Sequence, residues 1–331
     1  MTDRRFDVTA IGNAIVDVIA DSDDQFLAAQ GMRKGGMRLI DEAEATRLYQ
    51  AMRPGREASG GSAANTVAGL AAFGHKAAFI GQIGQDQLGE IFSHDIRSLG
   101  VSFDTPAKGA IGATARCLIL VTPDAQRTMN TFLGAAQMLV SEAIDEALIA
   151  DSKILYLEGY LWDPEAPRLA MRAAIAAARE AGTRVAFSLS DSFVVERHRD
   201  DLNALFDDGA IDILFANADE AVALTGAERF EDAVSALARR VPTAVVTRGD
   251  QGAVAVRGEE RALVPAQPIT KLVDTTGAGD LFAAGFLAGE ARELGLEESL
   301  RLGAIAAAEV IQHYGARPEA DLSALAAQAQ A

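Results

Sequence analysis

The second half of the sequence alternates helical patterns with short apolar strand patterns, and this alternation limits the fold more than any other feature. We expect, in chain order, a helix at 141–150, a strand at 154–157, a helix at 164–181, a strand at 184–189, a helix at 196–207 and a strand at 211–216. A strand, a helix and a second strand in succession form a crossover unit with parallel strands. The chain therefore predicts an α/β fold with helices on both faces of a mostly parallel sheet.

The charge balance restricts the partners of the protein. The 331 residues include 30 Lys and Arg against 47 Asp and Glu, a formal net charge of -17. This excess of acid argues against nucleic acid or an anionic membrane surface as a partner, so any phosphate group has to be held locally. The longest uncharged run, residues 58–75, is too short and too polar to cross a bilayer. Because Cys117 is the single cysteine, an internal disulfide cannot form, and we expect a soluble cytoplasmic protein.

The segment at 273–289, V-D-T-T-G-A-G-D-L-F-A-A-G-F-L-A-G, has the character of an anion site beside a base. Gly277, Ala278 and Gly279 form a turn that opens into an apolar helix, so unpaired backbone N–H groups and the helix dipole face a ligand. Asp280 follows in the first helical turn, where the dipole favours an ionised carboxylate that can take a proton from a substrate hydroxyl. The combination suggests phosphoryl transfer to an alcohol. The alternative is a simple turn with Asp280 as a helix cap.

Two N-terminal segments place polar side chains where the same ligand could reach them. Residues 6–11 form a short buried strand that delivers Asn13 and Asp17 to its carboxyl edge, where open α/β sheets bind ligands. Gly60 and Gly61 open an Ala-rich helix and can act as a hinge. The alternatives are a solvated strand residue for Asp17 and a plain loop-to-helix cap for the glycine pair.

The string D-T-T-G-A-G-D-x-F-x-x-G at 274–285 resembles the C-terminal signature of the ribokinase-like family of sugar and nucleoside kinases. Four further motifs fit this family in the expected order, at 12–17, 60–65, 217–220 and 247–252, and the resemblance covers essentially the whole chain. A dinucleotide-binding fold is disfavoured because no G-x-G-x-x-G follows the first strand. A P-loop fold is disfavoured because the sequence has no G-x-x-x-x-G-K-[ST].

The resemblance implies a role for each motif. The implied assignments are Asp280 as general base, Gly277, Ala278 and Gly279 as anion hole, Asn13, Asp17 and Asn65 as acceptor contacts, Gly60 and Gly61 as lid hinge, Glu220 with Asn217 as the Mg²⁺ and phosphate site, and Thr247, Gly249 and Gly252 as an ATP-binding turn. Carboxylates and waters are the ligands that Mg²⁺ prefers. The alternative for Asn217 and Glu220 is a helix N-cap with an acidic first turn.

Two further parts of the nucleotide side follow from the same resemblance. It suggests a monovalent cation such as K⁺ beside the loop 274–276, which includes Thr276, and near Gly315. The helix expected at 296–313 carries Gly303 and Ala307 among other small side chains. Small side chains admit an adenine ring or simply allow close helix packing, and both alternatives stay open.

The resemblance also implies the architecture. It implies one kinase domain over residues 1–331, with a three-layer αβα core at 1–16, 61–107 and 134–331 and a β-rich lid at 17–60 and 108–133. Alternating side chains at 114–122 and 127–132 predict a strand pair in the lid. Monomers and lid-mediated homodimers both occur among such folds, so the oligomeric state stays open.

The expected acceptor is a nucleoside, adenosine first, phosphorylated on its primary hydroxyl by ATP and Mg²⁺. The strings G-N-A-I-V-D at 12–17, F-L-x-x-x-G-M at 26–32 and L-S-D-S-F at 189–193 resemble adenosine kinases more closely than ribokinases or fructokinases. A nucleobase needs flat apolar walls, which Tyr160 and Phe193 can supply just past the ends of two strands. A sugar kinase is the alternative within the family, and a non-catalytic nucleotide- or sugar-binding protein is the alternative outside it.

Overall fold

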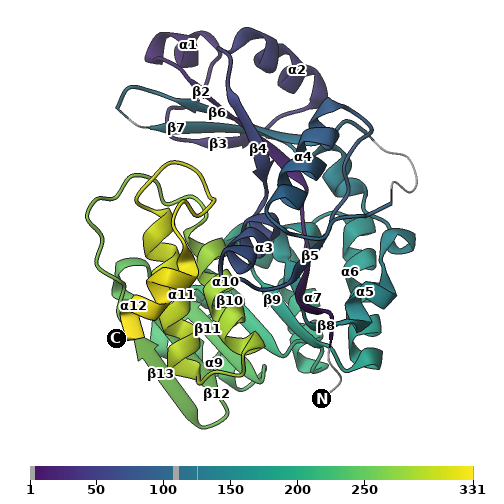
Figure 1. Cartoon of the computed structure of the whole chain (residues 1–331), viewed down its shortest axis with the longest axis vertical. Helices are drawn as coiled ribbons and strands as arrows, with labels where there is room; N and C mark the ends of the chain where they lie inside the picture. Colours follow the sequence, from purple (N-terminus) through teal and green to yellow (C-terminus); the bar gives the residue numbers. More distant parts are fainter. Residues whose placement is uncertain (1–3, 107–111, 125, 331) are drawn as a thin grey trace.

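The computed structural model describes residues 4–106, 112–124 and 126–330, and its largest element is an eight-stranded sheet (Figure 1). The strand order is β13-β12-β11-β10-β9-β8-β1-β5. The strands are β1 (Phe6–Ile11), β5 (Ala77–Ile80), β8 (Ser152–Glu158), β9 (Arg184–Ser188), β10 (Ile213–Asn217), β11 (Thr243–Thr247), β12 (Ala253–Arg257) and β13 (Glu260–Val264). Neighbours from β11 to β5 are parallel, whereas β12 and β13 return antiparallel. The expected mostly parallel sheet is confirmed.

Helices cover both faces of this sheet and complete three layers. One face carries α3 (Ser62–Ala72), α10 (Ala278–Ala291) and α11 (Leu296–Val310), and the other carries α5 (Glu146–Ala150), α6 (Glu165–Ala181), α7 (Ser192–Asp207), α8 (Ala218–Thr225) and α9 (Phe230–Ala238). Tyr156 of β8 packs into the core between the sheet and α3, α10 and α11. Its neighbours Leu155 and Leu157 pack into the core on the other face of the sheet. Strands buried on both faces need continuous apolar runs, as this sequence has. Within the described ranges, no helix combines the length and the apolar character needed to cross a membrane.

A second, five-stranded sheet lies above the large sheet in Figure 1. Its order is β3-β7-β6-β2-β4, and the strands are β2 (Ile15–Asp21), β3 (Met37–Leu39), β4 (Arg56–Gly60), β6 (Ala115–Val121) and β7 (Arg127–Phe132). Two helices, α1 (Asp24–Ala29) and α2 (Glu42–Ala51), belong to the same layer. The strands come from 15–60 and 115–132, so this sheet is discontinuous in sequence. The expected lid boundary at 107–108 lies outside the described residues.

Several elements differ from the sequence expectation. Asp17 lies inside β2 of the small sheet, not just beyond the end of β1. The expected helix at 141–150 is a short 3₁₀ turn, Ser141–Ala143, followed by α5. β4 has the sequence R-E-A-S-G, which lacks aromatic and β-branched residues, yet it pairs antiparallel with β2. It is a strand because its partner supplies the hydrogen bonds, a tertiary effect that local propensity does not record.

The glycine pair between β4 and α3 is tightly enclosed. A Cβ atom on Gly60 would overlap the carboxylate of Asp17, and one on Gly61 would overlap the backbone carbonyl oxygen of Asn13. Gly61 also has φ 98°, a conformation that L-residues rarely adopt. Both positions therefore require glycine for close packing around the first turn of α3.

We predict that Gly61→Ala lowers the free energy of unfolding by about 2–5 kcal/mol, the sum of the positive-φ strain and the overlap with Asn13. Gly100→Ala is the matched control, because Gly100 has φ 85° with nothing within 4 Å of its added Cβ. It should cost only the strain, about 1–2 kcal/mol. Urea unfolding of both variants measures the difference, and equal losses would contradict the packing argument.

Candidate active site

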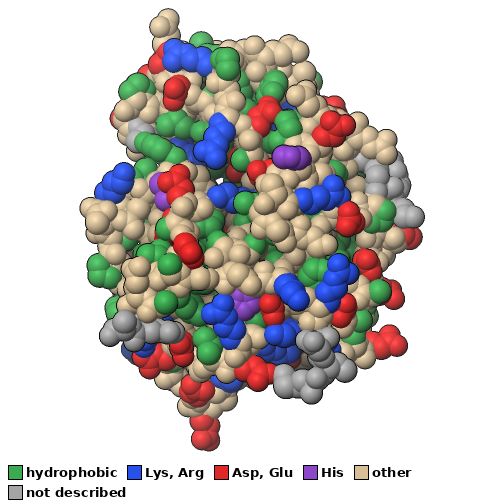
Figure 2. Space-filling view, viewed as in Figure 1, with side chains coloured by type: hydrophobic (Ala, Val, Ile, Leu, Met, Phe, Trp, Pro, Cys, Tyr) green, Lys and Arg blue, Asp and Glu red, His purple; other side chains and the backbone are tan. Residues whose placement is uncertain are grey.

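A cavity of about 690 Å³ lies between the carboxyl ends of the large sheet's strands and one face of the small sheet. Its lining includes residues that end β8, β10 and β11 and residues of β2, β3, β6 and β7. This is the edge at which open α/β sheets bind ligands. Acidic and basic side chains are interspersed over the face of the molecule shown in Figure 2.

The cavity gathers most of the residues that the sequence singled out. Those that line it are Asn13, Asp17, Gly61, Asn65, Tyr160, Phe193, Asn217, Glu220, Thr247, Thr276, Gly277, Ala278, Gly279 and Asp280. Their separation in the chain exceeds 260 residues, so the fold alone brings them together. Gly60 is not among the described lining residues, but it lies against the carboxylate of Asp17.

Four predicted nucleotide-binding residues, Gly249, Gly252, Gly303 and Ala307, are not among the described lining residues of this cavity. A Cβ atom on Gly303 would lie 2.8 Å from the backbone oxygen of Phe282, so this glycine lets α11 pack closely on α10. That contact matches the helix-packing alternative for Gly303. An adenine-binding role for the four residues stays a prediction.

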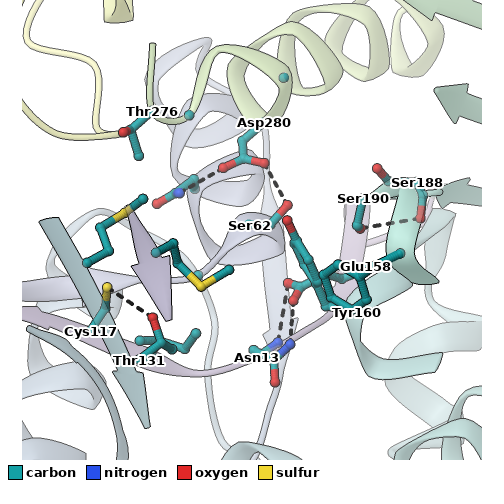
Figure 3. Close-up of a pocket in the computed structure, with 18 of the residues that line it drawn as sticks. Asn13, Ser62, Cys117, Thr131, Glu158, Tyr160, Ser188, Ser190, Thr276 and Asp280 are labelled. Atoms are coloured by element: carbon teal, nitrogen blue, oxygen red, sulfur yellow. Dashed lines mark hydrogen bonds between the residues drawn. The ribbon is translucent and has the colours of Figure 1, made fainter. Parts of the chain in front are cut away.

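Asp280 is the third residue of α10, in its first turn, and the N-cap Gly277 has φ 79°. Its Oδ1 accepts a hydrogen bond from Ser62 Oγ (2.6 Å) and its Oδ2 accepts one from Asn65 Nδ2 (2.8 Å), both from the start of α3 (Figure 3). The N–H of Ala278 donates to the carbonyl of Thr275 (3.2 Å), so part of the predicted anion hole is used within the turn. The carboxylate is fixed from one side and faces the cavity on the other.

Burial raises the pKa of Asp280 above its ordinary value, and the hydrogen bonds from Ser62 and Asn65 and the charge of Arg317 oppose this rise. The sequence suggested that the helix dipole keeps this carboxylate ionised. In the structure, loss of hydration outweighs those stabilising contacts. A carboxylate with a raised pKa is a stronger base than a solvated one, which suits proton transfer.

Glu158 is a site residue that sequence reasoning missed. It ends β8, and its carboxylate accepts hydrogen bonds from Asn13 Nδ2 (2.6 Å), Asn13 N (3.3 Å) and Ala63 N (2.9 Å). Burial raises the pKa of Glu158 to about 7. An acidic residue at the end of an apolar strand was the available signal, since such a position faces the ligand edge. Glu158 orients Asn13 toward the cavity and anchors the first turn of α3.

The small sheet contributes a further carboxylate with a raised pKa, and one ion pair. Burial raises the pKa of Asp17 to about 6, while the charges of Arg317 and Arg127 oppose the rise. Arg127 of β7 forms an ion pair with Asp274, and both side chains are almost completely buried. This pair ties the small sheet to the loop that precedes α10.

The loop 274–276 also meets Gly315, as the resemblance implied. Asp274 accepts hydrogen bonds from the N–H of Thr276 (3.0 Å), from its hydroxyl (2.7 Å) and from the N–H of Gly315 (3.2 Å). Since protein donors and Arg127 already surround this carboxylate, a monovalent cation here would depend on backbone carbonyls. The cation stays a prediction.

Aromatic and apolar side chains form the remaining walls. The rings of Tyr160 and Phe193 lie 6.1 Å apart, with Arg197 over the ring of Phe193 at 5.1 Å. Tyr160 extends toward Ser62 and Asp280 in Figure 3, whereas Cys117 and Thr131 of the small sheet lie across from it. Four apolar side chains of the small-sheet layer complete the opposite wall, Met37, Leu39, Met129 and Leu133.

Asn217 and Glu220 form a capping box at the start of α8. Asn217 donates from its N–H (2.9 Å) and its Nδ2 (2.7 Å) to the two oxygens of Glu220, and Glu220 N donates back to Asn217 Oδ1 (2.8 Å). Burial raises the pKa of Glu220 to about 7. Among the described residues, no group of three or more His, Cys, Asp or Glu is placed to hold a metal. Glu220 therefore fits Mg²⁺ through an intervening water better than as a direct ligand.

Comparison with known proteins identifies the kind of kinase family that the motifs indicated. The family model of the pfkB family carbohydrate kinases matches residues 7–322. The chain belongs to this family. Its members are phosphotransferases that act on sugars or nucleosides, and such an activity accounts for a cavity that contains both the Gly277–Gly279 turn, here called the anion turn, and the carboxylate of Asp280.

This pfkB-family kinase is similar to both adenosine kinases and a probable sugar kinase. A solved adenosine kinase from Sinorhizobium meliloti is 49% identical, with a TM-score of 0.89 and 98% of this chain and 99% of that chain covered. A solved probable sugar kinase from Rhizobium etli CFN 42 is 47% identical, with a TM-score of 0.91 and 99% of each chain covered. The adenosine kinase of Saccharomyces cerevisiae is 27% identical over 93% of this chain and 95% of its own length.

For this kinase we predict that Glu158→Gln raises the KM for the acceptor. The glutamine amide has only one acceptor oxygen, whereas both oxygens of Glu158 accept hydrogen bonds from N–H groups. Asn13 must therefore lose a hydrogen bond or flip its side-chain amide. Steady-state kinetics with varied acceptor measures the effect.

Glu290→Gln is the matched control, because Glu290 is also buried but pairs with Arg184 and Arg257. Glu290 does not line the cavity. The Glu290→Gln change should lower the stability of the protein and leave the KM for the acceptor unchanged. Equal KM values in wild type and Glu158→Gln would contradict the positioning role.

Proposed function

We propose that this kinase transfers the γ-phosphoryl group of ATP to the primary hydroxyl of a nucleoside, adenosine first. The observation that carries the proposal is the placement of Asp280 at an amide-rich helix start, in one cavity with Asn13, Asp17 and two aromatic rings. This arrangement combines a base, an anion site and a nucleoside-sized space. Two relatives are adenosine kinases, which supports the same acceptor.

Asp280 acts as general base in the proposed mechanism. Ser62 and Asn65 hold the carboxylate in one orientation, so its free lone pairs face the acceptor hydroxyl. As that oxygen attacks phosphorus, its proton passes to Asp280. The amides of Gly277 and Gly279 and the positive end of α10 stabilise the charge on the transferred group.

The same cavity supports a proposal for the nucleotide side. Thr247 and Asn217, at the ends of β11 and β10, border the region beside the anion turn and are proposed ATP contacts. Mg²⁺ bound with ATP would offset phosphate charge, and Glu220 with Asn217 would orient its water ligands. The small sheet, held over the cavity by Arg127, would exclude water from the transfer as a lid.

The paired charges in the cavity favour a neutral acceptor over a phosphorylated one. Two arginines occur in the described lining, and each is neutralised: Arg38 by Glu44 (2.7 Å) and Arg197 by Asp163 (2.8 Å). A second phosphate on the acceptor would need an unpaired cation. Asn13 and Asp17 suit sugar hydroxyls equally well, so a sugar kinase is the second candidate.

We predict that Asp280→Asn lowers kcat by about 10²–10⁴-fold, because it removes the proton acceptor and leaves the nucleotide contacts in place. Asp232→Asn is the control, since Asp232 lies exposed in the first turn of α9 and outside the cavity. It should leave kcat unchanged. An Asp280→Asn enzyme within a few-fold of wild type would exclude Asp280 as the base.

The acceptor is tested by kcat/KM values with ATP and Mg²⁺ for adenosine, inosine, guanosine, ribose and fructose. We expect a nucleoside to be preferred, and Phe193→Ala to raise its KM because a flat wall is lost. Phe230→Ala is the control, since Phe230 also lies under an arginine, Arg248, but outside the cavity. Preference for a free sugar over every nucleoside would refute the nucleoside as acceptor and would leave the assignment as a kinase unchanged.

A further inference from the structure

Arg317 is a partly buried residue in the segment after α11, two residues beyond Gly315 and outside the five motifs of the sequence. Its guanidinium donates to Ser59 O from Nη2 (2.7 Å) and Nε (3.2 Å), to Ser59 Oγ (2.8 Å) and to Ala64 O from Nη1 (2.5 Å). Ser59 belongs to β4 of the small sheet and Ala64 to the first turn of α3. One side chain therefore spans the Gly60–Gly61 junction and holds both of its ends.

Ser59, at one end of this junction, is also bound by a residue of another helix. Ser59 donates from its N–H (2.8 Å) and its hydroxyl (2.5 Å) to Asp95 of α4 (Gln87–Ser98). Because Ala64 lies between Ser62 and Asn65, the bond to Arg317 fixes the helix turn that carries both donors to Asp280. Arg317 thus reaches the catalytic carboxylate through one helical turn.

Arg317 also supplies a positive charge among acids. The titratable groups that interact electrostatically with Asp280 are Asp17 from β2, Tyr156 and Glu158 from β8, Tyr160 from the following turn, and Arg317. The charge of Arg317 lowers the pKa of Asp280 and of Asp17 against the effect of burial. Without this cation, neutral carboxyl groups are favoured in the cavity.

We propose that Arg317 is a positioning residue for phosphoryl transfer, which locks the hinge between the small sheet and α3 and keeps Asp280 able to accept a proton. This inference rests on the proposed role of Asp280 as base. It assigns a function to a residue that is not among those lining the cavity.

The test is the pH dependence of kcat with adenosine and ATP, from about pH 5 to about pH 9, for Arg317→Gln and Arg317→Lys. The base must be ionised, and removing a nearby cation raises its pKa, so the acid limb should move to higher pH. For Arg317→Gln we expect a shift of about one unit, a roughly tenfold loss at low pH that recovers at high pH. Arg317→Lys retains the charge and should stay close to wild type.

Arg292→Gln is the matched control, because Arg292 donates to Phe73 O (2.9 Å) at the opposite end of α3 and does not line the cavity. Its acid limb should not move. A fall in kcat by the same factor at every pH in Arg317→Gln, or equal shifts in the Gln and Lys variants, would overturn the proposal.

Circular dichroism melts show whether each variant folds, and Asp95→Asn provides a second route if Arg317→Gln does not. Removing the Asp95 charge leaves Arg317 to act on Asp17 and Asp280 alone, so the acid limb should move to lower pH. An unmoved or raised limb would contradict the inference. An active Asp280→Asn enzyme would instead refute the base itself, so the two failures are distinguishable.

Discussion

The contact between the first turns of α3 and α10 is the constraint on which the site depends. Asp280 comes from one turn and its two donors, Ser62 and Asn65, from the other. The helices approach this closely because Gly69 faces α10, where an added Cβ would lie 2.6 Å from Leu281 and 2.7 Å from Ala284. The position of the Asp280 carboxylate is therefore set by helix packing in the core, and not by a flexible loop.

Enclosing several carboxylates in one cavity has an electrostatic consequence. Asp17, Glu158, Glu220 and Asp280 all have raised pKa values, and in each of them burial is the largest cause. Each is held by protein donors or a nearby cation, which limits the cost of burying it. Titratable groups with shifted pKa values in one cavity are typical of catalytic sites, where base strength has to match the reaction.

The fold and most of the site could be predicted because their signals are local. Helix and strand periodicity indicates the parallel sheet, and the D-T-T-G-A-G-D string marks the start of α10 and the position of Asp280. Glu158, Arg317 and Arg127 escaped prediction because their partners lie far away in the chain; Ser59 and Arg317, for example, are 258 positions apart. Such contacts form only when the chain has folded, and no short pattern records them.

The proposed reaction is direct transfer of a phosphoryl group from ATP to a primary hydroxyl of the acceptor, with Asp280 as the base. Phosphorus NMR of the products from ATP, Mg²⁺ and adenosine tests it most directly, since coupling to a methylene group identifies a phosphate on the primary position. The account predicts ADP and adenosine monophosphate phosphorylated on the primary hydroxyl in equal amounts, with little free phosphate. Free phosphate as the main product, or a phosphate on a secondary hydroxyl, would contradict it.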